Sequence, residues 1–337
     1  MQLNINTKGT YLHIKDDMFE VRIKKGNGEY EKFHYSSKKV SSIILSLGIA
    51  LTTDAVKLAV KNNIDIIFSD YDGFPIGRVW HSKLGSTTKI RKKQLEASMN
   101  DIGLKWVKKW IIQKVQNQID FLTDLKKHRS EKLILINDKI QSIENLKNSL
   151  CLLNGGNTKD AADTLRGLEG SAGRIYFETL SLLLADEYKF DGRSSRPAKD
   201  MFNAFLNYAY GVLYARVEKA LIIAGVDPYL GFLHRDDYNQ LSMVYDFIEE
   251  YRTFADRSVY KLFSGKKVNQ SHIDNITNGY TLNKEGKILL MENFNKYFEE
   301  ETIRYKGRNQ TRSNIIQFDA HSFANSLIEK NDSLGDV

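Results

Sequence analysis

The hydrophobic pattern of this chain changes its period near residue 80, and this change constrains the fold more than any other feature. Before it, apolar residues alternate with polar ones, as at Phe19, Val21 and Ile23, which is typical of half-buried strands. After it, apolar residues recur every three or four positions, as in 106–115, which is typical of amphipathic helices. We therefore predict an α+β protein, with a small N-terminal β-rich domain followed by a larger, mainly α-helical C-terminal domain.

Turn residues and β-branched runs divide the N-terminal region further. The turn sequence Gly26-Asn27-Gly28 lies between two alternating runs and predicts a β-hairpin. Thr53 can cap a helix between two of the later runs. The expected strands lie at 19–23, 30–35, 40–45 and 64–68, and a second hairpin-like stretch begins at Asp72-Gly73 and ends at 79–80.

Between the two patterns lies the segment HSKLGSTTKIRKK at 81–93, which contains five Lys or Arg residues. Its small, hydroxyl-bearing and basic residues are typical of an interdomain linker. We therefore predict a β-rich domain at 1–82, a basic linker at 83–94 and a helical catalytic domain at 95–330. The helical pattern of this last domain covers 106–150, with a charged interruption at 126–132, and then 160–190, 198–224, 239–263 and 287–305.

The composition limits the chemistry that this chain can perform. The single cysteine, Cys151, excludes an internal disulfide and a structural zinc site with two thiolates from this chain. Because the longest apolar stretch, 43–51, is interrupted by Ser46 and Gly48, we expect neither export nor a membrane span, and we expect a cytoplasmic protein. The 49 Lys and Arg exceed the 42 Asp and Glu by seven, which favours a polyanionic partner without requiring one.

Carboxylate and imidazole groups stand in unusual surroundings in three segments. Glu169 precedes a run of small residues that permits close approach of another backbone or a ligand. His234 follows an apolar triplet, and Asp246 and Glu249 are three residues apart and therefore share a helical face. One imidazole with two or three carboxylates forms a mixed nitrogen and oxygen ligand set, which suits Mn²⁺ or Mg²⁺.

Each of these residues also has a purely structural interpretation. A histidine after an apolar triplet is more often a hydrogen-bonded structural residue. Carboxylates such as Asp246 and Glu249 more often lie on a solvated face or pair with a nearby arginine, here Arg252. Spacing alone therefore gives only a weak indication of a metal site.

Together, however, these segments resemble the CRISPR-associated integrase family, which is the catalytic subunit of the spacer-acquisition complex. The resemblance covers nearly the whole chain and implies the two-domain α+β fold. It also implies a homodimer that acts on double-stranded DNA (protospacer and repeat array). A further implied partner is a small ferredoxin-like companion protein of the adaptation complex. The matching segments occur in the family's order and spacing: the opening GTYL, GIALTTDAV, LRGLEGSAGRIYF, Arg196-Pro197, DMFNAFLNYAY, GVDPYLGFLH, and YDFIEEYR followed by ADR.

The resemblance also implies the catalytic residues. It assigns the metal ligands to Glu169 of the L-E-G stretch, His234 at the end of G-F-L-H, and Glu249, three residues after the aspartate of Y-D. That aspartate, Asp246, is expected nearby as a fourth catalytic residue that orients a ligand or collects a proton. The implied reaction is Mg²⁺- or Mn²⁺-dependent DNA cleavage and transesterification, in which a protospacer 3′-hydroxyl attacks a repeat boundary. The alternatives are a non-catalytic basic nucleic-acid-binding protein and, last, a small-molecule enzyme, for which no Gly-rich phosphate loop is visible.

DNA binding is expected from basic residues, although each of them is also consistent with an ordinary solvated side chain. Tyr176, Tyr208 and Tyr210 could stack on bases, but their helical spacing favours the core. The basic candidates are Lys83, Lys89, Arg91, Lys92 and Lys93 in the predicted linker, and Arg174, Arg193, Arg196 and Lys199 around the Glu169 region.

Overall fold

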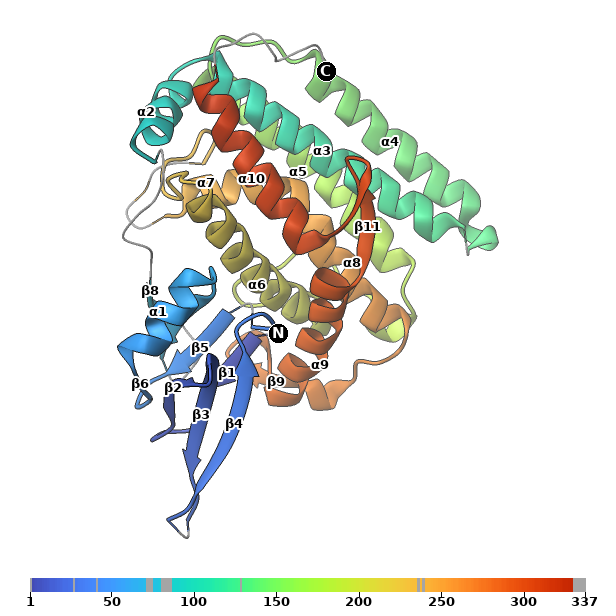
Figure 1. Cartoon of the computed structure of the whole chain (residues 1–337). Coiled ribbons are helices and arrows are strands. Elements are labelled where there is room, and N and C mark those ends of the chain that lie inside the picture. Colours follow the sequence, from blue (N-terminus) through green and yellow to red (C-terminus); the bar gives the residue numbers. More distant parts are fainter. Residues whose placement is uncertain are drawn as a thin grey trace. The chain divides into compact units, whose positions relative to one another are not determined.

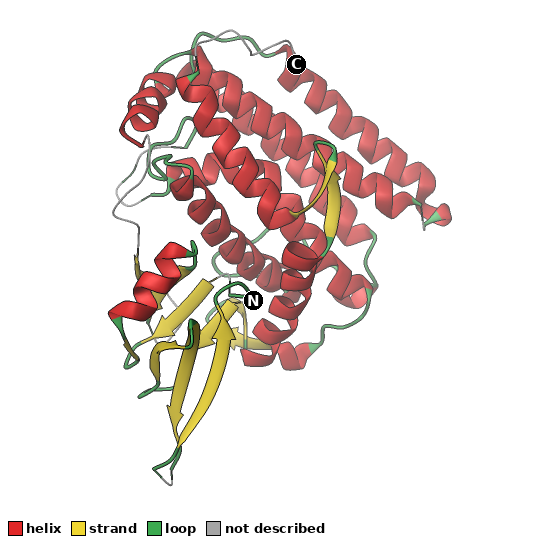
Figure 2. Ribbon diagram, in the orientation of Figure 1, coloured by secondary structure: helices red, strands yellow, loops and turns green. Residues whose placement is uncertain are grey.

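The protein has two compact units, Met1–Leu84 and Gly85–Val337, and the first is rich in strands while the second is mainly helical (Figures 1 and 2). The predicted α+β class and the order of its two parts are therefore confirmed. The computed structural model describes residues 2–26, 28–40, 42–70, 75–79, 87–127, 129–234, 237 and 240–329.

In the described residues of the first unit, two four-stranded sheets pack with one helix, and their apolar side chains, among them Leu12, Phe19 and Ile66, share one buried core. In one sheet, β1, β5 and β7 are parallel and β8 is antiparallel to β7; in the other, β4, β3 and β2 are antiparallel and β6 is parallel to β2. The strands are β1 (Gln2–Ile5), β2 (Tyr11–Lys15), β3 (Met18–Lys24), β4 (Tyr30–Ser36), β5 (Ser42–Ser46), β6 (Ala50–Leu51), β7 (Asp65–Ser69) and β8 (Pro75–Val79).

The predicted elements of the first unit are largely confirmed. The first hairpin is β3–β4, in which Phe19 pairs with Tyr35. Helix α1 (Thr53–Lys61) follows β6, and its N-cap is Thr52, one residue before the predicted cap; the Thr52 side chain accepts a hydrogen bond from the backbone of Ala55. Of the second predicted hairpin, 75–79 forms β8, whereas 72–74 and 80 lie outside the described residues.

Long helices around one large core form the second unit. Helix α3 lies beside α4 and α5, while α6 packs against α8 and α10 (Figure 1). Helix α7 continues through the 3-10 helix η3 into α8, and η3 packs against α3. These elements are α3 (Asp101–Lys126), α4 (Leu133–Leu152), α5 (Thr158–Leu182), α6 (Met201–Ile223), α7 (Ser242–Phe247), η3 (Ile248–Tyr251), α8 (Arg252–Ser264) and α10 (Arg312–Ile328).

The segment predicted as a basic linker is different in the structure. Residues 83–86 lie outside the described part, but residues 87–94 belong to helix α2 (Thr87–Ser98). Ile90, Gln94 and Ala97 form the buried face of this helix, and the basic residues lie on its exposed face. The sequence did not predict this helix because basic residues dominate the segment and only three side chains carry the helical spacing.

The C-terminal part also departs from the prediction. The predicted helix at 287–305 is helix α9 (Lys284–Asn295), a π-helix (Lys296–Glu300) and strand β11 (Thr302–Tyr305). Four-residue strands such as β11 carry too little alternation to be recognised in a sequence. Also not predicted were β9 (Ile273–Ile276), β10 (Gly279–Leu282), β12 (Arg308–Thr311), α10, and short 3-10 helices at Ser130–Lys132, Asp186–Tyr188 and Gln270–His272. Within the described ranges, no helix combines the length and the hydropathy needed to cross a membrane.

Candidate active site

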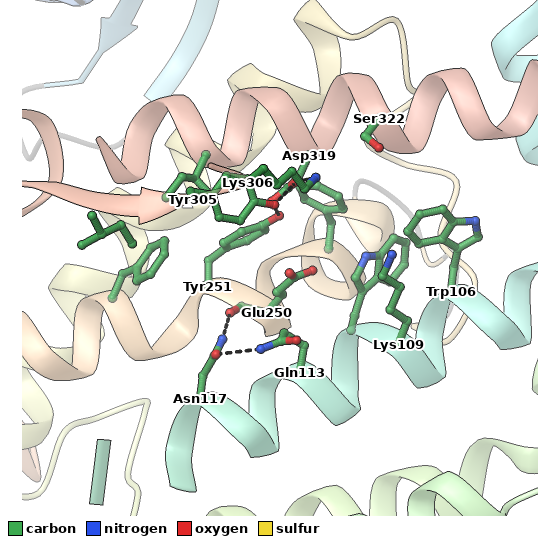
Figure 3. Close-up of a pocket in the computed structure, with 15 residues that line it drawn as sticks. Trp106, Lys109, Gln113, Asn117, Glu250, Tyr251, Tyr305, Lys306, Asp319 and Ser322 are labelled. Carbon is green, nitrogen blue, oxygen red and sulfur yellow. Dashed lines mark hydrogen bonds and ion pairs between the residues drawn. The ribbon is translucent and has the colours of Figure 1, made fainter. Parts of the chain in front are cut away.

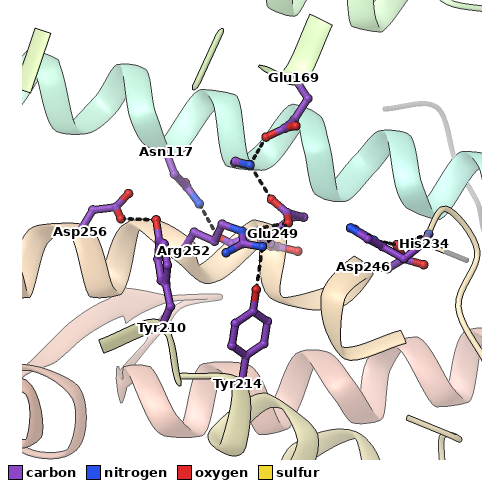
Figure 4. A network of polar contacts seen from close by, with 11 residues as sticks. Asn117, Glu169, Tyr210, Tyr214, His234, Asp246, Glu249, Arg252 and Asp256 are labelled. Atoms are coloured by element: carbon purple, nitrogen blue, oxygen red, sulfur yellow. Dashed lines mark hydrogen bonds and ion pairs between the residues drawn. The ribbon is translucent and has the colours of Figure 1, made fainter. Parts of the chain in front are cut away.

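Two of the predicted glutamates meet on opposite sides of a lysine. Lys114 of α3 donates to Glu249 of η3 (Nζ to Oε2, 2.5 Å) and also to Oε1 of Glu169 on α5 (Figure 4). The side chains of Lys114 and Glu249 are 9% and 10% exposed, whereas that of Glu169 is 29% exposed. Two carboxylates from different helices therefore share one cation, and Glu169 is the one that solvent reaches.

Arg252, one turn after Glu249, completes this charged group. Its Nε donates to Oε1 of Glu249 at 2.8 Å, and its Nη2 donates to the hydroxyl of Tyr214 at 3.1 Å. Burial alone would raise the pKa of Glu249, but Arg252 and Lys114 outweigh burial and lower this pKa to about 2. Burial alone would lower the pKa of Lys114, but Glu249 and Glu169 raise it. Both groups are consequently charged at neutral pH.

His234 is held by Asp246, which lies on α7. The imidazole Nδ1 is 2.6 Å from Oδ1 of Asp246, and the buried carboxylate also accepts the backbone N–H groups of Phe232 (2.5 Å), Leu233 (2.9 Å) and His234 (3.1 Å). A carboxylate only accepts, so Nδ1 is the donor in this contact, and in the neutral form of the ring Nε2 keeps the lone pair that can bind a metal. This carboxylate–histidine arrangement is the one that orients many metal-ligating histidines.

The backbone before His234 depends on a glycine and on two side chains that sequence reasoning did not identify. A Cβ atom at Gly231 would lie 2.6 Å from Cβ of Ser242, so only glycine fits there. Gln94 of α2 donates to the carbonyls of Asp227 (2.9 Å) and Leu230 (2.8 Å) and accepts from the N–H of Asp227. Arg166 of α5 donates to the carbonyl of Leu233 at 2.9 Å. The loop is therefore fastened to two different helices.

The structure brings the predicted catalytic residues together as two pairs. Glu169 lies with Glu249, and His234 lies with Asp246. In the part of the chain that the structure describes, no three His, Cys, Asp or Glu side chains form a group that could hold a metal ion. The predicted metal site therefore stays a prediction.

The donor chemistry nevertheless fits a divalent cation. Glu169, Glu249 and Nε2 of His234 supply two carboxylates and one imidazole, and the position between the carboxylates already holds a positive charge. Both oxygens of Asp246 accept hydrogen bonds from the His234 loop, so this residue is a positioning group for His234.

A cavity of about 540 Å³ adjoins His234 and has a basic and aromatic lining. Arg193 and Arg196, both predicted to bind DNA, lie on its wall together with Arg252. Arg193 donates to the side chains of Asn203 and Asn207 and lies over the Tyr210 ring, 5.3 Å from its centroid. This cavity is the candidate path for a polyanionic strand toward His234.

The tyrosines that could have stacked on bases are mostly structural. Tyr176 and Tyr210 are buried, and their hydroxyl groups donate to the buried carboxylate of Asp256 at 3.0 and 2.6 Å. Figure 4 shows the contact of Tyr210 with Asp256. Burial raises the pKa of Asp256, and the two tyrosine hydrogen bonds only partly oppose this effect. Tyr208 is half-buried. It lines a different cavity, of about 380 Å³.

The remaining basic candidates are exposed, and their role in binding stays a prediction. On α2, Arg91 lies 3.8 Å from Asp227 and Lys93 pairs with Glu96 at 2.5 Å. Lys199 donates to the carbonyl of Asn278 at 2.9 Å. The exposed candidates are Lys89, Arg91, Lys92 and Lys93 of α2, Arg174 of α5, and Arg193, Arg196 and Lys199, whereas Lys83 lies outside the described residues.

Comparison with known proteins places the chain in a family. The model of the family "CRISPR associated protein Cas1" matches residues 3–296. The chain is 31% identical over 327 residues to the CRISPR-associated endonuclease Cas1 1 of Archaeoglobus fulgidus, an alignment that covers 94% of this chain and 93% of that protein.

Two solved structures share the fold. A Cas1 protein from Thermotoga maritima has a TM-score of 0.76 at 20% identity, with 100% of this chain and 99% of that chain covered. A casposase bound to an integration product has a TM-score of 0.76 at 22% identity, with 99% and 92% covered. The fold and these matches define a CRISPR-associated protein. The chain belongs to the Cas1 family.

Proposed function

We propose that this protein is a divalent-metal-dependent DNA endonuclease and integrase that inserts protospacer DNA into a CRISPR repeat array by transesterification. The observation that carries the proposal is the pair Glu169 and Glu249, which share one cation between two helices. His234 and its basic cavity provide the imidazole and a path for DNA. The Cas1 family membership and the endonuclease name of the Archaeoglobus fulgidus relative support the same function.

In this proposal, Glu169, Glu249 and Nε2 of His234 would hold Mg²⁺ or Mn²⁺. The bound ion would polarise the scissile phosphate and lower the pKa of the attacking hydroxyl or water. Arg252 keeps Glu249 ionised, because it lowers the pKa of that carboxyl. Asp246 keeps the proton of His234 on Nδ1, so that Nε2 can act as a ligand.

Lys114 would have to leave its position between Glu169 and Glu249 for these two carboxylates to hold a divalent ion. Three cations in one small volume, Lys114, Arg252 and the divalent ion, would otherwise repel one another, since Arg252 also contacts Glu249. The long, flexible lysine side chain can then turn toward a phosphate oxygen of the DNA. In this proposal the ammonium of Lys114 occupies the place that a divalent ion would take.

The DNA itself would be bound mainly through its phosphates. Arg193 and Arg196 line the cavity at His234, and the exposed basic face of α2 lies on the helix that fastens the His234 loop through Gln94. Such contacts are electrostatic and largely independent of sequence. We further propose a homodimer and the small ferredoxin-like companion protein as partners, in line with the family.

The test compares Glu169→Ala and His234→Ala with the parent protein. We expect both variants to lose metal-dependent strand transfer of a 3′-hydroxyl duplex into a repeat-containing plasmid, measured with the companion protein present. Mobility shifts and melting curves should stay close to those of the parent, because neither side chain fills the core. Glu178→Ala, at an exposed position of the same helix as Glu169, is the matched control.

Three results would contradict the proposal. Variants that transfer strands at the parent's rate would remove these residues from the chemistry, and variants that unfold would show a structural role instead. A parent protein that binds DNA but neither cleaves nor joins it with Mg²⁺ or Mn²⁺ would favour the alternative function, a non-catalytic nucleic-acid-binding protein.

A further inference from the structure

A third cavity of the helical unit, of about 410 Å³, is lined by none of the predicted catalytic residues. It lies between α3, η3, the turn of the β11–β12 hairpin and α10 (Figure 3). The wall formed by β11, its turn and α10 follows residue 296, where the match to the family model ends. Part of this cavity is therefore built by a segment that the family match does not include.

Aromatic rings form a large part of the cavity wall. Trp106 and Trp110 of α3 have ring centroids 5.6 Å apart, and Tyr251 and Phe254 lie on the η3 and α8 side with centroids 5.9 Å apart. The faces of such rings carry negative electrostatic potential and attract organic cations. The wall therefore favours a flat, positively charged ligand over an anionic one.

One carboxylate in the cavity is fully satisfied. Asp319 of α10 accepts hydrogen bonds from the hydroxyl groups of Tyr251 (3.1 Å) and Tyr305 and from Nζ of Lys306 (3.0 Å). Lys306 is thereby paired, and the ammonium of the other lysine, Lys109, lies 4.6 Å from the centroid of the Trp106 ring. Neither ammonium forms a hydrogen bond or an ion pair with Glu250, although both act electrostatically on its carboxylate.

The carboxylate of Glu250 is different, because it has no hydrogen-bond or ion-pair partner anywhere in the described ranges of the chain. Its backbone carbonyl, in contrast, accepts from Nδ2 of Asn117 at 2.8 Å. In Figure 3 its side chain lies in the space between α3 and α10. Gln113 stands beside it and donates its amide N–H to Asn117 at 2.9 Å, which leaves the Gln113 amide oxygen as a second acceptor.

We propose that this cavity binds a planar organic cation, an amidinium or guanidinium group on a small apolar body. Such a group donates two parallel hydrogen bonds to a carboxylate, here Glu250, and can donate a further one to Gln113. Its flat face stacks on the aromatic wall, and the cavity volume is within the range of about 300–1,000 Å³ that small-molecule sites occupy. The natural source is either an arginine side chain of a partner protein or a free small molecule.

Occupancy of the cavity would bear directly on the catalytic region. Glu250 follows Glu249 in η3, and Asn117, which holds the Glu250 carbonyl, lies one helical turn after Lys114. A ligand on Glu250 therefore contacts the same short helix that carries a proposed metal ligand. The binding inference itself does not depend on the proposed function, since it needs no metal and no DNA.

The test uses benzamidine as the probe and isothermal titration calorimetry on the full-length protein. We expect saturable binding of benzamidine, and binding of neutral benzamide that is at least about tenfold weaker, because charge-assisted hydrogen bonds are lost. Benzoate, which carries the opposite charge, should not bind. Glu250→Gln should weaken benzamidine binding by at least about tenfold, whereas Glu187→Gln, at an exposed position, should leave it unchanged.

Two further probes distinguish the sources of the cation. Binding of Nα-acetyl-arginine amide as tight as that of benzamidine would indicate a protein arginine, whereas binding of benzamidine and agmatine alone would indicate a free small molecule. Absence of saturable benzamidine binding overturns the proposal. So does equal binding by benzamide or an unchanged affinity in Glu250→Gln, since either result shows that the carboxylate does not recognise the ligand.

Discussion

Replacement of Lys114 by methionine should make the stability of the protein depend on divalent metal. Methionine preserves most of the aliphatic length of the lysine but removes the ammonium that Glu169 and Glu249 share. Without it, Glu249 keeps only Arg252, and Glu169 loses the one ion-pair partner it has among the described residues. Two carboxylates then repel each other across a small buried space.

The expected loss of stability can be estimated from the burial of these groups. Removal of one partner from a buried ion pair typically costs about 3–5 kcal/mol. The Glu169 side chain is 29% exposed and can be partly solvated, so we expect the lower end, about 3 kcal/mol. For a domain of this size class, each kcal/mol lowers the melting temperature by about 2–4 °C, which gives a decrease of about 6–12 °C.

Mn²⁺ should reverse this loss and should bind the variant more tightly than it binds the parent. In Lys114→Met the ion no longer displaces an ammonium, so we expect its dissociation constant to fall by at least about tenfold, which corresponds to about 1.4 kcal/mol. At a free Mn²⁺ concentration one hundred times the dissociation constant, the stabilisation is about 2.7 kcal/mol and recovers most of the lost stability. Thermal melts with and without MnCl₂, and electron paramagnetic resonance of free Mn²⁺, measure both effects.

Lys139→Met is the matched control. Lys139 forms an exposed ion pair with Glu178 at 3.4 Å, and exposed ion pairs contribute little to the free energy of unfolding. An unchanged melting temperature of metal-free Lys114→Met would show that the ammonium does not hold the two carboxylates. Weaker or equal Mn²⁺ binding by the variant would refute the exchange of ammonium for metal. A parent protein with no Mn²⁺ binding at all would instead refute the metal site itself.

Three further outcomes follow from the contacts described. Burial and the neighbouring Asp319 raise the pKa of Glu250 from 4.5 to about 7. The folded state therefore holds this proton more tightly than the unfolded state, and the free energy of unfolding should decrease by up to about 3 kcal/mol as pH rises from about 4.5 to 7. Urea titrations of Glu250→Gln should lack this decrease. Asp246→Asn should reduce strand transfer by about 10–100-fold with DNA binding retained in mobility shifts, because His234 loses the carboxylate that orients it. Replacement of the basic residues 91–93 by alanine should reduce the slope of log affinity against log salt concentration by up to about three. An unchanged slope would show that α2 is not part of the DNA-binding surface.

The sequence predicted the large divisions of this fold because those depend on repeated local patterns. The hairpin β3–β4 and the long helices α3 to α6 each repeat their signal over many residues. The four-residue strands β9 to β12 do not, and they were missed. Helix α2 was missed for another reason: its exposed basic residues resembled a linker, and only the spacing of Ile90, Gln94 and Ala97 indicated a buried face.

The candidate site shows the same limit at the level of single side chains. Glu169, Glu249 and His234 were identified because they lie in motifs, whereas Lys114 and Gln94 lie in none. Both of these residues, however, occupy positions on the apolar stripes of their helices, and a buried lysine or glutamine requires a polar partner.

That rule predicts that such a partner exists but does not identify it, since Lys114 and Glu249 are 135 residues apart and Gln94 and Asp227 are 133 apart. A pairing across such a separation is fixed only when the helices pack, because nothing local to either segment specifies the other. A lysine or glutamine on an otherwise apolar helical stripe is therefore the part of this sequence that most directly indicates a site assembled from distant segments.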